Sequence, residues 1–284
     1  MIQLNDFLYG KMDFPQVFAD LLNTDALKRL AGVHQSGAIF LVNPDICHSR
    51  QEHAIGVTML IKKLGGSELE QIAGLLHDIS HTAFSHVGDY VFDNVDEDYH
   101  EQVFAEVIYR SEIPDVLLKY GYDVKEIIFG TFNILEQPMP LLCADRLDYT
   151  LRDSIHGGII SRQSARSFLS SVVMNNGKIA INDDQQVAWI NEVFEKLNNE
   201  VFKLPLHLYA NGKMAELIKK FLNKGLLKES DMFKTDTLLL NKIRTNYEGY
   251  EAIKCIKQLK GFAEYIRHGS LPKIKTRTLR AMLA

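Results

Sequence analysis

The chain has 284 residues, of which 46% are hydrophobic and 24% are charged, and its formal net charge at pH 7 is −4. This composition is typical of a folded globular protein and excludes a disordered or fibrous chain. The negative charge argues against nucleic acid as the main partner, because nucleic-acid-binding proteins usually carry a basic surplus. Three scattered cysteines without a CxxC spacing indicate a reducing compartment, and the sequence shows neither a secretory signal nor an apolar run of membrane-spanning length. A cytoplasmic location without membrane contact is therefore expected.

The first half of the chain predicts a series of helices. Apolar residues recur at helical spacing over residues 13–35, 50–64, 67–78 and 99–110. A further helix is expected over 141–153, after two prolines and before a pair of glycines. The apolar run at 38–42 predicts either a strand or a buried turn, because so short a run fits both.

The second half predicts one hairpin and further helices. Asn176-Gly177 stands between two apolar stretches within 172–181, which is typical of a β-hairpin with a type I′ turn. Residues 185–267 return to a helical pattern. The basic segment 273–277 is expected to be a solvated end or a docking strand.

Histidines concentrate in one stretch, because six of the ten lie between residues 48 and 100. His53 and His77 lie on the apolar faces of predicted helices, and Asp78 directly follows His77. Neighbouring residues diverge by about 100° around a helix, so this pair can reach one ion only where the helix ends. Asp145 is expected to face inward from the 141–153 helix. A single inward histidine is more often an ordinary core residue, but burying all four groups without a compensating charge is very costly. Together they predict a divalent metal site.

Four motifs carry a resemblance to a known family. They are HSRQEH at 48–53, HDISHTAFSH at 77–86, HE at 100–101 and DRLDY at 145–149. They resemble the HD superfamily of metal-dependent phosphohydrolases and, within it, the deoxynucleoside triphosphate triphosphohydrolase branch, with the similarity running over residues 4–160. The resemblance implies an HD-type helical fold and a metal held by His53, His77, Asp78 and Asp145. It selects His53 over His48 as the first ligand, in agreement with the helical-face argument.

The chain departs from the usual pattern of that branch mainly around the substrate pocket. Five positions carry other residue types than the branch usually has: Ser36, Ser80, Thr82, Ala83 and Arg146. Arg146 stands in place of a lysine, which keeps the charge but changes the geometry of phosphate binding. The branch's later helix usually carries an arginine and a Tyr-x-His-Lys run, whereas residues 201–209 here are VFKLPLHLY. We therefore expect an intact metal centre beside an altered substrate pocket.

Candidates for proton transfer to the leaving oxygen are three further histidines of the motifs, His81, His86 and His100. By resemblance, Asp89 would orient one of them, as carboxylates commonly orient imidazoles. The alternative for each histidine is an ordinary hydrogen bond within the core.

Substrate contacts are expected from both polar and aromatic side chains. Arg50 and Arg146 are candidates for neutralising the charge on phosphoryl oxygens. Gln35 is a candidate substrate contact by its match to the branch's glutamine. Tyr149 and Asp153 are candidate sugar-side contacts, with a purely structural role as an equally weighted alternative.

The resemblance implies that the protein hydrolyses a nucleotide phosphoester, with a deoxynucleoside triphosphate giving deoxynucleoside and triphosphate as the leading reaction. A triphosphate brings about four negative charges, which a water-excluding pocket must answer with fixed cations. Lys203 and Lys213 of the divergent helix are candidates for that role. Two imidazoles and two carboxylates suit Fe, Mn, Zn or Ni, and Mg is a further candidate together with substrate.

Three alternatives stay open at this point. The substrate could be a nucleoside monophosphate or another small phosphate ester, or the protein could be a catalytically quiet module that binds nucleotide. An HD-fold diiron oxygenase would have to recruit His81 and His100 for a second iron. The resemblance also implies a homo-oligomer, at least a dimer. Residues 1–160 are expected to form the phosphohydrolase core, and residues 161–284 to complete the same domain with the hairpin and a helical region.

Overall fold

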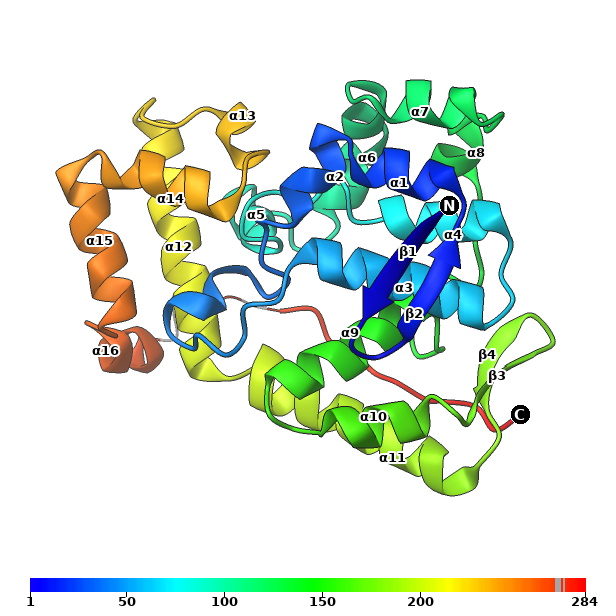
Figure 1. Ribbon diagram of the computed structural model, residues 1–284. Helices are drawn as coiled ribbons and strands as arrows, with labels where there is room; N and C mark the ends of the chain where they lie inside the picture. Colours follow the sequence, from blue (N-terminus) through cyan, green and yellow to red (C-terminus); the bar gives the residue numbers. More distant parts are fainter. Residues whose placement is uncertain (269–271, 273) are drawn as a thin grey trace.

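A computed structural model describes residues 1–268, 272 and 274–284 of the protein. Helices dominate the chain and two small antiparallel hairpins complete it, which confirms the predicted mostly α fold class (Figure 1). In chain order the helices are α1 (Gln16–Leu22), α2 (Asp25–Leu30), the 3₁₀-helix η1 (Gly37–Leu41), α3 (Arg50–Lys63), α4 (Glu68–Leu76), α5 (Val87–Val91), α6 (Tyr99–Tyr109), α7 (Ile113–Lys119), α8 (Val124–Phe129), α9 (Ala144–His156), α10 (Arg162–Phe168), α11 (Asp184–Leu197), the π-helix η2 (Asn198–Phe202), α12 (Pro205–Asn223), α13 (Glu229–Met232), α14 (Asp236–Arg244), α15 (Tyr247–Lys257) and α16 (Phe262–Arg267).

The two hairpins are formed by neighbouring strands. β3 (Val172–Asn175) pairs with β4 (Lys178–Ile181), as predicted. The φ angles of Asn176 and Gly177 are 50° and 73°, and two positive values are what a type I′ turn requires. The other hairpin, β1 (Ile2–Asp6) with β2 (Gly10–Phe14), was not predicted.

Capping boxes fix the start of the two helices that carry the first metal motifs. Ser49 accepts a hydrogen bond from the Glu52 amide, and the Glu52 carboxylate accepts one from the Ser49 amide in return. Ser67 and Glu70 form the same arrangement before α4. Such caps satisfy the free N–H groups of a first helical turn and add about 1 kcal/mol each. They explain why α3 and α4 lie where the periodicity predicts them.

Several expected boundaries change in the structure. The 38–42 run forms the 3₁₀-helix η1, so the buried-turn alternative is the correct one and the strand is wrong. The helix expected from residue 141 begins only at Ala144, because the Leu141 amide instead closes a turn onto the Pro138 carbonyl at 3.1 Å. The segment 13–35 is divided among the end of β2, α1 and α2.

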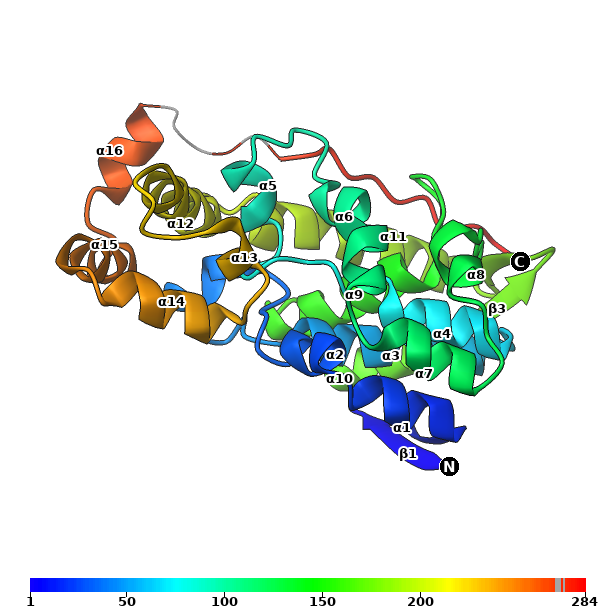
Figure 2. The same cartoon turned by 90° about the horizontal axis from the view of Figure 1, so that it is seen from above.

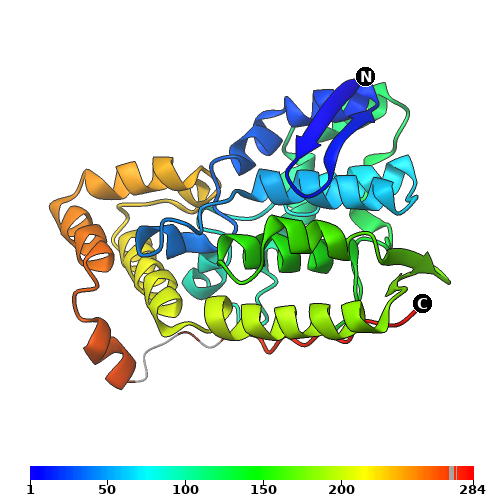
Figure 3. The ribbon, with the colours of Figure 1, turned by 60° about the horizontal axis from the view of Figure 1, so that its bottom comes forward.

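Helix α3 lies at the centre of the fold and packs against both α4 and α9, while α9 in turn packs against α11 (Figures 1 and 3). The main hydrophobic core extends from Leu4 to Leu279 and joins these helices to both hairpins. A second core surrounds α12, which packs against α5, η1, α15 and α16. The long helix α12 therefore connects the far end of the molecule to the loops that follow α4.

The described C-terminal residues 274–284 contain no helix or strand, apart from an isolated bridge at Leu283. Lys273 lies outside the described residues, while 274–277 pass along the side of α6 and α11 (Figure 2). The last residues of the chain dock on β4, where the Ile181 amide donates to the Met282 carbonyl at 2.8 Å. Within the described part of the chain, no helix is both long and apolar enough to cross a membrane.

Candidate metal centre

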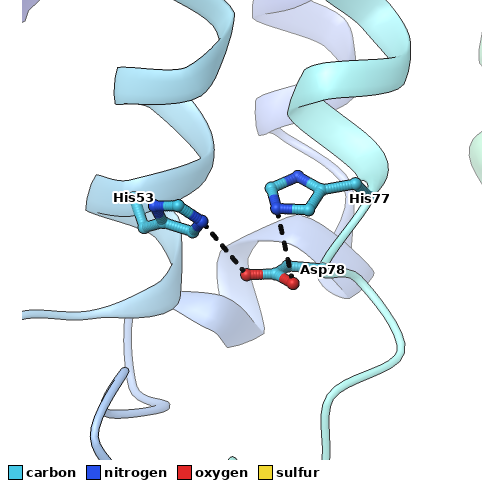
Figure 4. A group of neighbouring side chains, drawn as sticks. All are labelled: His53, His77 and Asp78. Carbon is cyan, nitrogen blue, oxygen red and sulfur yellow. Dashed lines mark ion pairs between the residues drawn. The ribbon is translucent and has the colours of Figure 1, made fainter. Parts of the chain in front are cut away.

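Three helices bring the four predicted metal ligands together. His53 lies in the first turn of α3, His77 and Asp78 directly follow the last residue of α4, and Asp145 lies in the first turn of α9. Figure 4 shows the imidazoles of His53 and His77 converging from two helices on the Asp78 carboxylate. The helix end at Leu76 is what allows the adjacent His77 and Asp78 to reach one point.

The donor atoms lie at separations that suit one ion. His53 Nε2 is 3.0 Å from Asp145 Oδ1 and 3.7 Å from Asp78 Oδ2. His77 Nε2 is 3.4 Å from Asp78 Oδ1 and 3.5 Å from Asp145 Oδ1. Two ligand atoms that are each about 2.1 Å from a common ion lie roughly 3.0–3.5 Å apart. The ligand atoms of His53, His77 and Asp78 all lie within 4.8 Å of one another, so these three side chains could hold a metal ion, and Asp145 lies close to both imidazoles.

The hydrogen bonds of the two imidazoles point their free nitrogens toward that site. Nδ1 of His53 lies 2.8 Å from Asp148 Oδ2, and Nδ1 of His77 lies 2.8 Å from the Gly74 carbonyl oxygen. Both partners are acceptors, so Nδ1 carries the proton and Nε2 holds a lone pair. His77 Nε2 is buried without a hydrogen-bond partner, which is costly for a polar atom unless it binds a cation. This donor chemistry fits a metal.

The electrostatics of the cluster call for positive charge. Burial disfavours ionised Asp78 and Asp145, but the facing cations and imidazoles outweigh it and hold the pKa of both carboxyls below the usual range. Burial also lowers the pKa of His53, yet hydrogen bonds with Asp145 and Asp148 outweigh that effect and raise it to about 10. Either protons on the imidazoles or a metal ion must therefore balance the carboxylates.

A buried ionic network supports His53 from behind, and sequence analysis did not predict it. Asp148 accepts from His53 and also pairs with Arg152, whose guanidinium reaches Asp6 at 2.9 Å. The Tyr9 hydroxyl donates to Asp148 at 2.8 Å. A Cβ at Gly56 would lie only 2.3 Å from Asp148 Oδ1, so α3 must carry glycine there. The signal that could have revealed this role is the spacing of Asp145, Asp148 and Arg152 along one face of α9.

Three further histidines of the motifs, His81, His86 and His100, cluster beside the metal centre. The rings of His81 and His100 stack at 3.9 Å, and His86 lies edge-on to both. Asp89 holds His86 Nδ1 at 2.9 Å and also accepts from the Tyr99 amide, which is the orienting geometry expected of it. Burial lowers the pKa of His100 to about 4 and that of His81 well below its usual value, which favours neutral imidazoles.

A cavity of about 550 Å³ opens onto the donor cluster, and its walls carry most of the predicted site residues. Those that line it are Gln35, Arg50, His77, Asp78, His81, His86, His100, Asp145, Arg146, Tyr149 and Asp153. His53 and Asp89 lie behind this surface, next to the residues that they contact. The volume falls within the range of about 300–1,000 Å³ typical of small-molecule sites.

Several of these side chains already have partners in the protein. Arg50 donates to Asp78 at 2.6 Å and to Ser85 Oγ at 2.9 Å, so it fixes one ligand carboxylate. The Arg146 guanidinium is directed at the carbonyls of Leu141 and Gln137. Asp153 Oδ1 lies 2.7 Å from His48 Nε2. By contrast, Oε1 of Gln35 is buried without a partner, which leaves it available to a bound molecule.

The two lysines expected to add positive charge do not line the cavity among the described residues. Lys203 is exposed at the end of η2, and Lys213 on α12 pairs with Glu216 at 2.7 Å. Their expected role in the pocket is therefore wrong, because neither residue is part of the cavity wall. Lys275 and Arg277 of the C-terminal segment line the cavity instead.

Comparison with known proteins agrees with this geometry. Residues 50–153 match the HD domain family. The uncharacterized protein YdhJ of Bacillus subtilis is 43% identical over 247 residues, which cover 86% of this chain and 76% of that protein. The metal-dependent phosphohydrolase cns2 of Cordyceps militaris is 30% identical over 236 residues, which cover 80% of this chain and 68% of that protein.

Two more distant similarities complete the comparison. The deoxynucleoside triphosphate triphosphohydrolase SAMHD1 of Danio rerio is 30% identical over 194 residues, 60% of this chain and 30% of the relative. The crystal structure of a hypothetical protein from Aquifex aeolicus superposes with a TM-score of 0.72 at 22% identity, covering 91% of this chain and 76% of that one, and shows the shared fold. Fold, donor set and relatives together define a helical metal-dependent phosphohydrolase. The chain belongs to the HD-domain family.

Proposed function

We propose that this protein is a nucleotide phosphohydrolase whose leading substrate is a deoxynucleoside triphosphate. It would hydrolyse this substrate to deoxynucleoside and triphosphate. The observation that carries the proposal is that His77, Asp78 and Asp145 face the same cavity as Arg50 and Tyr149. A metal donor set, a guanidinium and an aromatic ring in one wall suit a phosphate joined to a nucleoside. The similarity to SAMHD1 supports the same substrate class.

Each group has a defined part in the proposed reaction. A bound divalent ion would be held by His53, His77, Asp78 and Asp145, and would polarise a phosphoryl oxygen and acidify a water molecule. Arg50 keeps Asp78 in place and presents its remaining N–H groups to phosphate oxygens.

Proton supply to the leaving oxygen is assigned to the histidine cluster. His86 lies on the cavity wall with its Nδ1 held by Asp89, so its Nε2 is the ring nitrogen left for proton transfer. His81 and His100 pack against this ring and exclude water from one side of it. Gln35 and Tyr149 would contact the nucleoside part of the substrate, and His48 would hold Asp153 in the wall.

A small phosphate monoester, such as a nucleoside monophosphate, is the second candidate, and a specific observation favours it. The cavity wall carries three glutamates, Glu97, Glu101 and Glu136, whereas Lys203 and Lys213 lie elsewhere. Fewer unopposed cations suit a substrate with fewer negative charges.

A second group of side chains could also hold a metal ion. Asp78, His81 and His100 offer ligand atoms within 4.8 Å of one another, and a diiron site would use this group for its second iron.

Product analysis separates these candidates. Protein loaded with Mn, Fe, Ni or Zn should be incubated with a panel of nucleoside mono- and triphosphates, and the products identified by chromatography. The leading proposal expects deoxynucleoside and inorganic triphosphate, while the second expects nucleoside and phosphate from monophosphates alone. Nucleotide binding without turnover by any metal-loaded form would indicate a binding module. Changing Lys203 and Lys213 together is a control that should leave turnover unaltered.

We also propose that the protein works in the cytoplasm as a homo-oligomer of at least two chains. The three free cysteines fit a reducing compartment. The exposed apolar side chains of α14 and α15, including Leu238, Tyr247 and Tyr250, support assembly. Light scattering at micromolar concentration, with and without nucleotide, tests the assembly. A monomer under both conditions contradicts it.

A further inference from the structure

The C-terminal segment forms part of the cavity although it lies more than a hundred residues beyond the metal motifs. Four consecutive residues, 274–277, line the cavity together with the proposed metal ligands His77, Asp78 and Asp145. Figure 2 shows this segment passing beside α6 and α11 on its way to the β3–β4 hairpin. A segment in this position can contact any molecule that fills the cavity.

Contacts on both sides fix the segment in place. The side chain of Glu97 is only 3% exposed and accepts a hydrogen bond from the Lys275 amide at 2.8 Å. The same carboxylate pairs with the Arg277 guanidinium. Further along, the Arg280 amide donates to the Pro140 carbonyl at 2.9 Å. A buried carboxylate and backbone hydrogen bonds thus make the segment a defined wall.

The two basic side chains of this wall keep hydrogen-bond donors free. A guanidinium has five N–H donors, and Arg277 uses its Nη2 on Glu97 while its Cζ lies 5.6 Å from the centre of the Phe202 ring. The Lys275 ammonium has three donors, and within the described residues its hydrogen bond is to the Asp96 carbonyl at 3.3 Å. By comparison, Arg50 donates to three protein acceptors and Arg146 to two, so each has fewer N–H groups left for a ligand.

We propose that the C-terminal segment completes the substrate site and that Lys275 and Arg277 bind phosphate oxygens of the substrate. This inference rests on the proposed function, because it assigns the phosphate-binding role left open by Lys203 and Lys213. Glu97 positions both residues and sets how much of the Arg277 charge reaches the substrate. Charge-assisted hydrogen bonds from a fixed guanidinium and ammonium are the strong contacts that phosphate recognition uses.

Binding of inorganic triphosphate and of inorganic phosphate to the full-length protein tests the proposal without relying on turnover. Isothermal titration should show Kd for triphosphate rising about tenfold in Arg277→Met and in Lys275→Met. Arg280→Met is the matched control, because Arg280 is an exposed arginine of the same segment that does not line the cavity. It removes the same charge and should leave Kd unchanged.

Folding is checked with a second variant. Arg277→Met leaves the Glu97 carboxylate buried and unpaired, so the double change Glu97→Gln with Arg277→Met removes the pair together and should restore the melting temperature but not the affinity. Lys275→Met disturbs no buried partner.

The outcomes are distinct. Equal triphosphate affinity in Lys275→Met, Arg277→Met and Arg280→Met would overturn the role of the segment, as would a wild-type protein that binds neither anion. Nucleotide turnover by the wild type would then still support the proposed function. Conversely, triphosphate binding that depends on Lys275 and Arg277 in a protein that hydrolyses no phosphate ester would uphold the segment and reject the proposed function.

Discussion

Around the metal centre, the ionised side chains come from three helices of the main core, and each has several protein partners. Asp148 contacts His53, Arg152 and Tyr9, and it is fully buried. Another part of the cavity wall, here called the outer wall, is formed by Glu97 and residues 274–277 and has one buried carboxylate and two basic residues with few contacts. The difference indicates that the fold itself fixes the metal ligands, while the outer wall keeps its donors for the substrate.

Replacing Arg152, which supports the metal centre, should give the largest effect, a loss of folding stability. Arg152→Met leaves the buried carboxylates of Asp6 and Asp148 without their cation, and losing one partner of a buried pair costs about 3–5 kcal/mol. Urea denaturation in the presence of a chelator measures the free energy of unfolding without a metal contribution. Lys275→Met in the outer wall is the matched loss of one cation and should change it little. Similar values for the two variants would refute the distinction between the regions.

Changing Asp148, the residue behind His53, should have a smaller effect than replacing Arg152, and that effect should be on metal affinity. Asp148→Asn weakens the acceptor that holds Nδ1 of His53, and loss of such outer contacts typically costs about 10–100-fold in metal affinity. Competition with a chromophoric chelator measures the change. Asp153→Asn is the control, because Asp153 holds His48 rather than a proposed ligand. If both variants bind metal as tightly as the wild type, Asp148 has no role in the centre.

The change of metal affinity with pH should be the smallest of these effects. Hydrogen bonds with Asp145 and Asp148 outweigh burial and raise the pKa of His53 to about 10, so below that pH the ion must displace a proton from this imidazole. The apparent metal affinity should therefore fall as the pH falls, by about tenfold per pH unit for each proton displaced. Chelator competition across neutral pH gives the slope. A flat profile would show that His53 releases no proton on binding.

The helices around the metal were predictable because their signals are local. The apolar spacing, the serine–glutamate caps and the paired motifs at 48–53 and 77–86 all lie within short windows of sequence. The β1–β2 hairpin lacks such a signal. Its inward positions include Asp6, which is buried because it pairs with Arg152, so the usual alternation of apolar and polar residues is broken.

The site shows the same contrast between local and distant determinants. The spacing of the histidine and aspartate motifs predicted which side chains meet, and the structure brings His53, His77, Asp78 and Asp145 together. The contact of Arg277 with Glu97 joins residues that are 180 positions apart. No periodicity encodes that pairing, so the sequence predicted a solvated end or a docking strand for the basic tail segment, and favoured lysines nearer in the sequence as phosphate contacts.

The central claim is that His53, His77, Asp78 and Asp145 bind a divalent metal ion, and the metal content of the protein tests it most directly. Purified wild-type protein should contain about one divalent ion per chain by elemental analysis, and His77→Ala and Asp78→Ala should lose it because each removes a direct ligand. His81→Ala should retain the ion, because His81 Nε2 lies 3.3 Å from Asp78 Oδ1 and acts on the site through that carboxylate. Circular dichroism of each variant establishes that it is folded. Full occupancy in both folded ligand variants would contradict the assignment of the metal centre.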